Sequence, residues 1–174
     1  VVVALQEFAR INKIEAGEMV MGYGYDDSQM PDGNLLNRDH LDKAFPENPV
    51  MVMHVSLHGA VLNSLALKKN GMSAKTTTPP GGVIVRKPGT NEPFGLLMET
   101  AFLPIFAQLP KPSSDQLKAQ VKSGQMIYAS AGITTAQEGA THLHDLIILQ
   151  NAADAGDLFI DVVSYPFITE IDSV

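Results

Sequence analysis

The sequence contains no cysteine and no tryptophan among its 174 residues. Without thiolates, disulfides and cysteine-ligated zinc sites are both excluded. The absence of cysteine suits the reducing cytoplasm and is equally compatible with the periplasm, so the compartment stays open.

Basic residues are scarce as well. Twelve Lys and Arg stand against nineteen Asp and Glu, which gives a net charge of −7 without any basic cluster. A nucleic acid is therefore not an expected partner. Long apolar runs are also missing: Val50–Met53 and Ala101–Ala107 are far too short to cross a bilayer, and no membrane partner is expected.

An initiator methionine is lacking too, and the chain opens on the apolar run Val1–Leu5. Chain termini are usually polar and loosely ordered, so this start predicts a segment of a longer protein. Hydrophobic residues make up 45% of the sequence, which is enough for the core of one ordinary domain or two small ones.

The first part of the chain predicts mixed structure. Apolar periodicity and stop signals predict helices over 1–14, 38–45, 59–70 and 99–109, with Asn37 as the N-cap of the second. Apolar or alternating runs predict strands over 18–25 and 50–56. A breaker-rich loop between 83–87 and 94–98 predicts a β-hairpin.

The remainder alternates between helices and strands. Ser113 and Gln116 form a capping-box pattern at the start of a helix, followed by a short strand over 133–137. A helix over 141–155 and a second strand over 158–168 complete the alternation, which is typical of a parallel α/β sheet. Two such strands cannot close a barrel, so this part resembles a slice of a larger α/β fold.

The pair His142 and His144 is the first candidate metal site. On a strand both imidazoles would face one side, but at the start of a helix they point about 200° apart. Because the pair follows Thr141, a plausible helix N-cap, the helical alternative is favoured and no metal role is predicted.

Other candidates follow predicted strands, where ligands bind in open α/β folds. His54 and His58 lie at the end of one strand and the expected start of the next helix, with Asn63 further along. The alternative is one core histidine, one helix-start histidine and an ordinary surface amide. No Ser-His-Asp spacing, Gly-x-Ser-x-Gly or HExxH motif is present.

Two more strand ends carry acidic groups. Tyr25 and Asp26 end the strand over 18–25, and the alternative is a sheet edge packed on a loop. Glu138 follows the strand over 133–137, which suits a catalytic or ligand carboxylate. Its alternative is a solvated loop residue.

Several segments together resemble one family. EMVMGYGYDDSQMPDG at 18–33 resembles W-I-x-G-x-G-W-D-E-x-x-W-P-x-G of the YtcJ-like amidohydrolases, or amidohydrolase family 3. RDHLD at 38–42 and NPVMVMHVSLHGAVLNSLAL at 48–67 resemble its R-x-x-L-D and P-V-x-L-x-H-x-S-G-H-x-A-x-x-N-S-x-A-L. Similar motifs match at 78–86, 92–99 and 131–138, in the family's order.

The chain departs from these motifs in four places. Tyr25 and Met30 replace the two tryptophans, Leu57 replaces a glycine, and Glu138 replaces an aspartate. Because such changes alter the shape of a pocket, the family's substrate specificity does not carry over.

The resemblance implies an α/β fold: a partial TIM-like barrel of a metal-dependent hydrolase, with a mixed α+β insertion that contains the β-hairpin. Residues 1–14 would be the helix after the first barrel strand, 15–108 the insertion, and 109–174 a partial barrel with the second and third strands. The family's HxH would precede Val1 and its other metal ligands would follow Val174.

The function that the resemblance implies is hydrolysis of an amide or related C–N bond, other than a peptide bond, in a small molecule. The complete protein would use a divalent metal such as zinc, whereas this segment is expected to bind no metal, to carry no catalytic residue and to be inactive alone. Its expected contribution is a substrate pocket, lined by Tyr25, Asp26, His58, Asn63 and Glu138.

Two alternatives remain open. Some members of the family carry the name exoenzyme regulatory protein, which allows a non-catalytic regulatory or binding module. A partial barrel would also expose unpaired strand edges, so the segment could self-associate through them.

Overall fold

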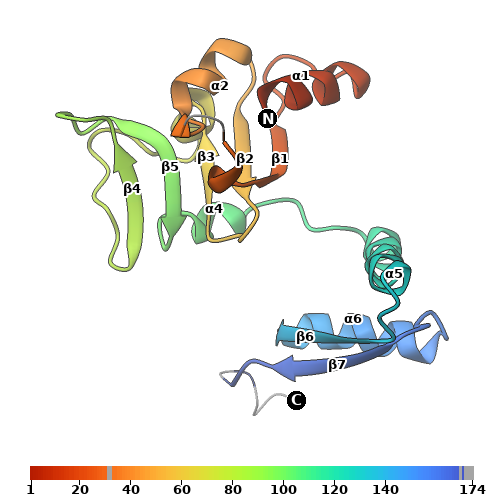
Figure 1. Ribbon diagram of the computed structural model, residues 1–174. Helices are drawn as coiled ribbons and strands as arrows, with labels where there is room; N and C mark the ends of the chain where they lie inside the picture. The colour runs from red at the N-terminus through yellow and green to blue at the C-terminus, as the bar shows by residue number, and fades with distance from the viewer. Residues whose placement is uncertain (31–32, 169, 171–174) are drawn as a thin grey trace. The chain divides into compact units, whose positions relative to one another are not determined.

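A computed structural model describes residues 1–30, 33–168 and 170, and the chain falls into two compact units, Val1–Leu109 and Pro110–Val174 (Figure 1). No helix among the described residues is both long enough and apolar enough to span a membrane.

The first unit is built on a five-stranded mixed sheet in the order β1-β2-β3-β5-β4. Its strands are β1 (Val20–Tyr25), β2 (Val50–His54), β3 (Gly59–Leu62), β4 (Gly82–Arg86) and β5 (Pro93–Glu99). The β1–β2 pair is parallel, and the other three pairings are antiparallel. The predicted hairpin is confirmed as β4–β5.

Helices α1 (Val2–Ile11), α2 (Arg38–Ala44), α3 (Ser64–Lys69) and α4 (Leu103–Phe106), with the single turn η1 (Asp27–Gln29), complete this unit. Asn37 caps α2 as predicted: its side chain accepts hydrogen bonds from the backbone N–H groups of Asp39 and His40. Helix α1 ends at Ile11, earlier than the predicted 14.

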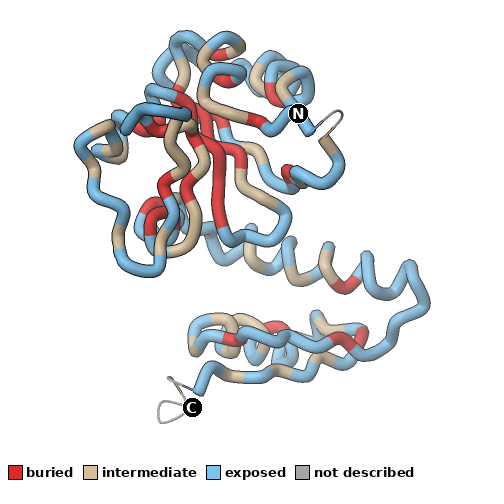
Figure 2. Tube along the Cα trace, turned by 60° about the vertical axis from the view of Figure 1, so that its left-hand side comes forward, coloured by how far each residue is buried: buried red, intermediate tan, exposed pale blue. Residues whose placement is uncertain are grey.

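The core of the unit lies on both faces of the sheet, because alternate residues of a strand point to opposite sides. Met51, Leu62 and Leu97 belong to one apolar cluster, with Phe102. Val50, Val52 and Val61 belong to the other, with Leu5 and Leu41 from the helices. Figure 2 shows this burial as red segments along the central strands.

The helix predicted over 59–70 is wrong in its first half. Residues Gly59–Leu62 form β3, which pairs with β2, and the helix begins only after Asn63. All four residues of β3 are buried, a pattern that fits a central strand as well as a helix. A Cβ atom at Gly59 would lie 2.6 Å from the carbonyl oxygen of Leu97, so glycine permits the close approach of β5.

The helix predicted over 99–109 is also corrected. Strand β5 runs on to Glu99, and only Leu103–Phe106 is helical, with Pro104 in its first turn. Pairing with β3 and β4 extends β5 beyond the point where the sequence pattern alone ended it.

The second unit contains α5 (Ser114–Ser130), β6 (Thr135–Thr141), α6 (Leu143–Asp154) and β7 (Asp161–Pro166). The capping box of Ser113 and Gln116 is confirmed, and so is the parallel pairing of the two strands. Strand β6 is shifted from the predicted 133–137, and His142 rather than Thr141 occupies the N-cap position of α6. The described residues form an α/β fold in which no barrel is closed.

Candidate functional site

A cavity of about 280 Å³ lies in the first unit, beside the ends of β1 and β2. Its walls are mostly apolar, whereas one end carries polar groups. The apolar lining consists of Leu35, Leu36, Val61, Val85, Phe94, Leu96 and Met98, and the polar end consists of Asp27, His54 and Ser56, with Tyr25 and Gly59 beside them. An apolar pocket with a few convergent polar groups is the usual form of a small-molecule site.

The parallel pairing of β1 and β2 builds the polar end. Tyr25 is the register partner of His54 at the carboxyl ends of the two strands, and Asp27 lies two residues beyond the end of β1. The Tyr25 ring meets the His54 ring edge-on, with 5.9 Å between centroids and an interplanar angle of 85°.

Tyr25 is 6% exposed, and its hydroxyl oxygen accepts a hydrogen bond from the Leu36 N–H at 3.1 Å. Burial raises the pKa of the Tyr25 phenol above its ordinary value, with a smaller contribution from the Asp27 and Asp26 carboxylates. The phenol therefore stays neutral and anchors the Leu35–Leu36 wall of the cavity to β1.

His54 is held in one orientation by Ser56 and Asp27. The Ser56 backbone N–H donates to Nδ1 at 3.1 Å, and the Ser56 hydroxyl lies 2.7 Å from the same nitrogen. Because a backbone N–H can only donate, this network assigns the proton of the neutral ring to Nε2. Nε2 then donates to Asp27 Oδ1 at 3.1 Å.

Asp26 lies next to this pair. Its Oδ1 accepts hydrogen bonds from the Ser28 backbone N–H at 2.9 Å and from the Ser28 hydroxyl at 2.7 Å. These bonds, led by the one from the hydroxyl, lower the pKa of the Asp26 carboxyl, so this group is ionised at neutral pH. The mouth of the cavity thus carries two carboxylates, at Asp26 and Asp27.

Asp26, Asp27 and His54 each place one ligand atom within 4.8 Å of the others, and they form the single such group of three in the described part of the chain. The hydrogen-bond network does not fit a resident metal, however. His54 presents an N–H to Asp27 and uses its lone pair on the Ser56 N–H, whereas a metal ligand must present the lone pair.

The structure brings some of the predicted pocket residues together. Tyr25 lines the cavity, and Asp26 adjoins its polar end. His58 lies in the turn between β2 and β3, not at the start of a helix as expected. Its Nδ1 is 2.8 Å from Glu99 Oε1, its side chain is 65% exposed, and it does not line the cavity.

Asn63 has a structural role instead. It is fully buried, and its Oδ1 accepts hydrogen bonds from the N–H groups of Val50 and Ala66, both at 2.9 Å. Its amide nitrogen donates to the Asn48 carbonyl at 2.8 Å. Asn63 therefore caps α3 and ties it to the start of β2, at the opposite end of that strand from the cavity.

Glu138 belongs to the second unit. It lies inside β6 rather than after it, because the strand continues to Thr141, and its Oε1 accepts a hydrogen bond from the Ala140 N–H at 3.0 Å. Together with Ala136 and Ile160 it lines a separate cavity of about 180 Å³.

The two histidines of the HxH pair have different carboxylate partners. His142 Nδ1 lies 2.8 Å from Glu170 Oε1, whereas His144 Nε2 lies 3.0 Å from Asp145 Oδ1. The Glu170 carboxylate raises the pKa of His142, and His142 in turn lowers the pKa of Glu170. This arrangement is an ion pair at the start of α6.

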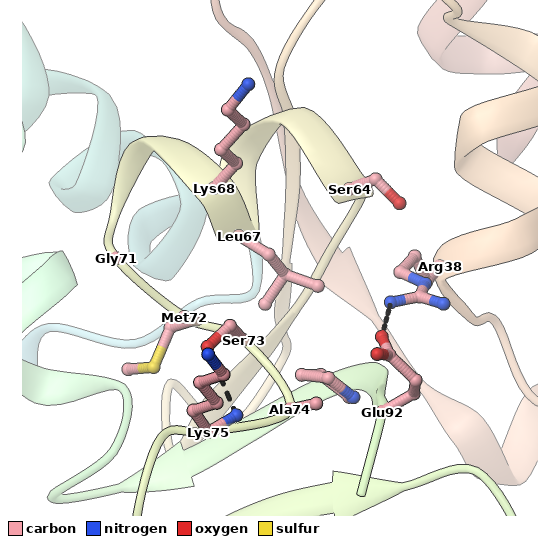
Figure 3. A pocket seen from close by; sticks show the side chains of 11 residues that line it. Arg38, Ser64, Leu67, Lys68, Gly71, Met72, Ser73, Ala74, Lys75 and Glu92 are labelled. Carbon is pink, nitrogen blue, oxygen red and sulfur yellow. Dashed lines mark hydrogen bonds and ion pairs between the residues drawn. The ribbon is translucent and has the colours of Figure 1, made fainter. Parts of the chain in front are cut away.

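A larger and more open cavity of about 590 Å³ lies elsewhere in the first unit (Figure 3). Arg38 and Glu92 form an ion pair at one side of it, 3.2 Å apart, and Lys68 and Lys75 also line it. Arg38 Nη1 is paired with Glu92, whereas its buried Nε has no hydrogen-bond partner among the described residues. Because the other charged groups that line this cavity, Glu92, Lys68 and Lys75, are exposed, it offers a weaker case for a ligand site.

The pocket expected from the sequence included neither His54 nor Asp27, although both line the cavity. The available signal was that His54 ends β2 and Asp27 lies just beyond β1, at the carboxyl ends where side chains of parallel strands converge. The apolar walls on β4 and β5 had no such signal, because their contribution depends on the sheet order β1-β2-β3-β5-β4.

Comparison with known proteins finds an amidohydrolase family model and several similar sequences. The model of the amidohydrolase family matches residues 3–173. The Bacillus subtilis (strain 168) protein YtcJ, named as an inferred amidohydrolase, is 35% identical over 92 residues, 53% of this chain and 17% of its own length. Arthrobacter pascens N-substituted formamide deformylase is 34% identical over 88 residues, 51% of this chain and 16% of its own.

Protein LONG AFTER FAR-RED 3 of Arabidopsis thaliana is 30% identical over 125 residues, 72% of this chain and 21% of its own length. The aligned regions thus span about a fifth or less of each curated relative. A crystal structure of an uncharacterized metal-dependent hydrolase from Pyrococcus furiosus matches 97% of this chain and 33% of that one, with 19% identity and a TM-score of 0.54. This structural likeness concerns the fold.

Proposed function

The chain belongs to the amidohydrolase family, and on that premise we propose that it is part of a metal-dependent hydrolase that cleaves an amide or related C–N bond, other than a peptide bond, in a small molecule. The observation that carries the proposal is the apolar cavity with Asp27 and His54 at its mouth. Such a cavity can hold one substituent of a small amide and orient the bond to be cleaved.

The reaction divides between this chain and the rest of the protein. Water adds to the carbonyl carbon, the C–N bond breaks, and the nitrogen leaves with a proton as an amine. A bound divalent metal, such as zinc, supplies an activated water at neutral pH. We assign its ligands to parts of the protein outside residues 1–174, because the Asp26–Asp27–His54 group does not fit a resident metal.

Within this division the first unit is the insertion that carries the substrate pocket, and β6 and β7 are the second and third strands of a TIM-like barrel. Parallel strands joined through a helix are the repeating unit of such barrels, which supports this assignment. Tyr25 and the Leu35–Leu36 segment shape the pocket, whereas the Asp27–His54 pair faces the polar part of the substrate.

The experiment is hydrolysis of a panel of N-substituted amides by the complete protein, with the released amine measured directly. We expect turnover that a chelator abolishes and added zinc restores. Asp27→Asn should raise KM for the best substrate by about tenfold or more, as for loss of a charged hydrogen-bond partner. Glu47→Gln, an exposed charge change just before β2 at its other end, is the matched control.

The proposal fails if the metal-loaded complete protein hydrolyses no amide or related C–N compound. It also fails if residues 1–174 alone hydrolyse the panel, because the metal ligands would then lie within this chain.

We also propose that the segment on its own self-associates through strand edges. Among the described residues, β1 and β4 each border the five-stranded sheet, and β6 and β7 each have a single partner. Unpaired edges are templates for pairing with another chain. Light scattering of the 174-residue chain should show mass rising with concentration, and a constant monomer mass would contradict this proposal.

A further inference from the structure

The shape and charge of the cavity narrow its occupant to one chemical class. We propose that it binds a small apolar amine, with an alkyl or aryl group inside and a cationic nitrogen at the carboxylates of Asp27 and Asp26. The inference rests on the proposed function for one point only, namely that this amine is the product released when the C–N bond of the substrate breaks.

The apolar half of the ligand follows from the walls. Seven of the described lining residues are Leu, Val, Phe or Met, contributed by β3, β4, β5 and the Leu35–Leu36 segment. A cavity of about 280 Å³ is at the small end of ligand pockets, which begin at about 300 Å³. It therefore suits a single ring or a short chain.

The charge of the ligand follows from the mouth. Asp27 lines the cavity, and an Asp26 oxygen lies within 4.8 Å of the ligand atoms of Asp27 and His54. The described lining residues include no Lys or Arg. A carboxylate ligand would be repelled there, whereas an ammonium group can donate to oxygens that have spare acceptor capacity.

His54 fixes the position of the Asp27 carboxylate that would bind the ligand nitrogen. Its Nε2–H already donates to Asp27 Oδ1, and Ser56 fixes its other nitrogen. The imidazole thus holds the Asp27 carboxylate in place and leaves Asp27 Oδ2 to accept a hydrogen bond from the ligand nitrogen. His54 is a positioning residue for this carboxylate.

The test uses the 174-residue chain and three probes of equal length: hexylamine, 1-hexanol and hexanoate. Binding is followed by amide chemical-shift changes of residues along the cavity. We expect the amine to bind about tenfold or more tightly than the alcohol, the usual gain from a charged hydrogen bond, and the acid to bind least.

Two substitutions separate the two halves of the site. Asp27→Asn should remove most of the amine preference, since Asp26 is then the one carboxylate left in this group, and should leave alcohol binding unchanged. Val85→Phe should fill the cavity and weaken both probes, whereas Leu65→Phe, at an exposed position of α3 that does not line the cavity, should change neither. Asp27 is largely exposed, so its replacement leaves the core intact.

The inference is overturned if hexylamine and hexanol bind equally to the unaltered chain, or if Asp27→Asn leaves the amine preference in place. It is also overturned if zinc chloride binds the mouth and displaces hexylamine, since the group would then be a metal site. Hydrolysis by the complete protein tests the proposed function separately: amine binding without amide hydrolysis contradicts only the proposed function.

Discussion

The two units of this chain bury their side chains to very different extents. The first has apolar clusters on both faces of a five-stranded sheet. Among the described residues after Pro110, the buried apolar side chains are only Ala136, Ala152 and Ile160. Both units expose large apolar residues, but in the second unit these outnumber the buried ones: Met126, Ile127, Tyr128, Ile133, Ile147, Phe159, Val163, Tyr165, Phe167 and Ile168.

The difference shows that a segment of this chain can form regular helices and strands without burying enough apolar surface to be stable by itself. The second unit has a capping box at the start of α5 and a parallel strand pair, yet two strands with few buried side chains are marginally stable alone. Its exposed apolar faces are the kind of surface that another chain or domain can cover. The first unit carries its own core and the candidate site.

The largest expected effect is a difference in hydrogen exchange between the units. Amides of β3 and β5 should exchange about a thousandfold more slowly than those of β6 and β7, which corresponds to a gap of about 4 kcal/mol in opening free energy. Hydrogen exchange of the 174-residue chain followed by NMR measures it. Equal protection of the amides in both sheets would contradict a difference in stability between the two units.

A core truncation should affect the first unit alone. Leu97 is fully buried in β5, and Leu97→Ala should lower the free energy of unfolding of this unit by about 2–5 kcal/mol. Urea denaturation checks the value. Leu103→Ala, at a position 48% exposed, is the control and should have a much smaller effect.

Buried amide side chains offer a matched pair across the units. Asn63 satisfies the N–H groups of Val50 and Ala66, while Gln125 Oε1 accepts from the Phe159 and Ile160 N–H groups. Asn63→Ala should cost about 1–3 kcal/mol, because buried donors lose their partner. Gln125→Ala should instead release the Phe159–Ile160 segment.

These two variants are compared by urea denaturation and by amide exchange at the residues named. If Gln125→Ala lowers the stability of the first unit as much as Asn63→Ala does, the two units unfold as one, and their separation is wrong.

The smallest effect concerns His142 and Glu170. The carboxylate raises the pKa of His142 above its ordinary 6.5, and the imidazolium lowers the pKa of Glu170 below its ordinary 4.5. The stabilisation from His142 is complete below 6.5 and is lost as the pH rises through the raised pKa. That from Glu170 is complete above 4.5 and is lost as the pH falls, so the pair contributes most between these values.

NMR titration of the His142 ring should show its pKa falling toward 6.5 in Glu170→Gln. The matched control is Asp154→Asn, at the other end of α6, which should leave the pKa of His142 unchanged. A His142 pKa that does not respond to Glu170→Gln contradicts the ion pair.

Local signals in the sequence predicted much of the fold. The side chains of Asn37 and Ser113 cap their helices by accepting hydrogen bonds from backbone N–H groups two or three residues further along. The β4–β5 hairpin follows from its turn residues. The boundary at Asn63 could not be read in this way. The buried run Gly59–Leu62 fits helix and strand alike, and pairing with β2 and β5 decides between them.

The candidate site was predictable only in part, for the same reason. Tyr25 and Asp26 could be predicted as site residues because they lie at the end of a strand. The position of His54 beside Tyr25 could not, because it depends on the pairing of β1 with β2. The opposite wall, with Val85 and Phe94, comes from strands far along the chain.

The parallel β1–β2 pair has a consequence for the order in which the first unit assembles. Met51 pairs with Leu62 and Arg86 with Pro93, so those hairpins close short loops, whereas Val20 must find Val50. Contacts between distant residues form late because the loop entropy comes first. Since Asp27 and His54 meet only across β1–β2, and Val61 meets Leu96 only across β3–β5, the proposed binding site forms with these non-local pairings, and ligand binding can report on them.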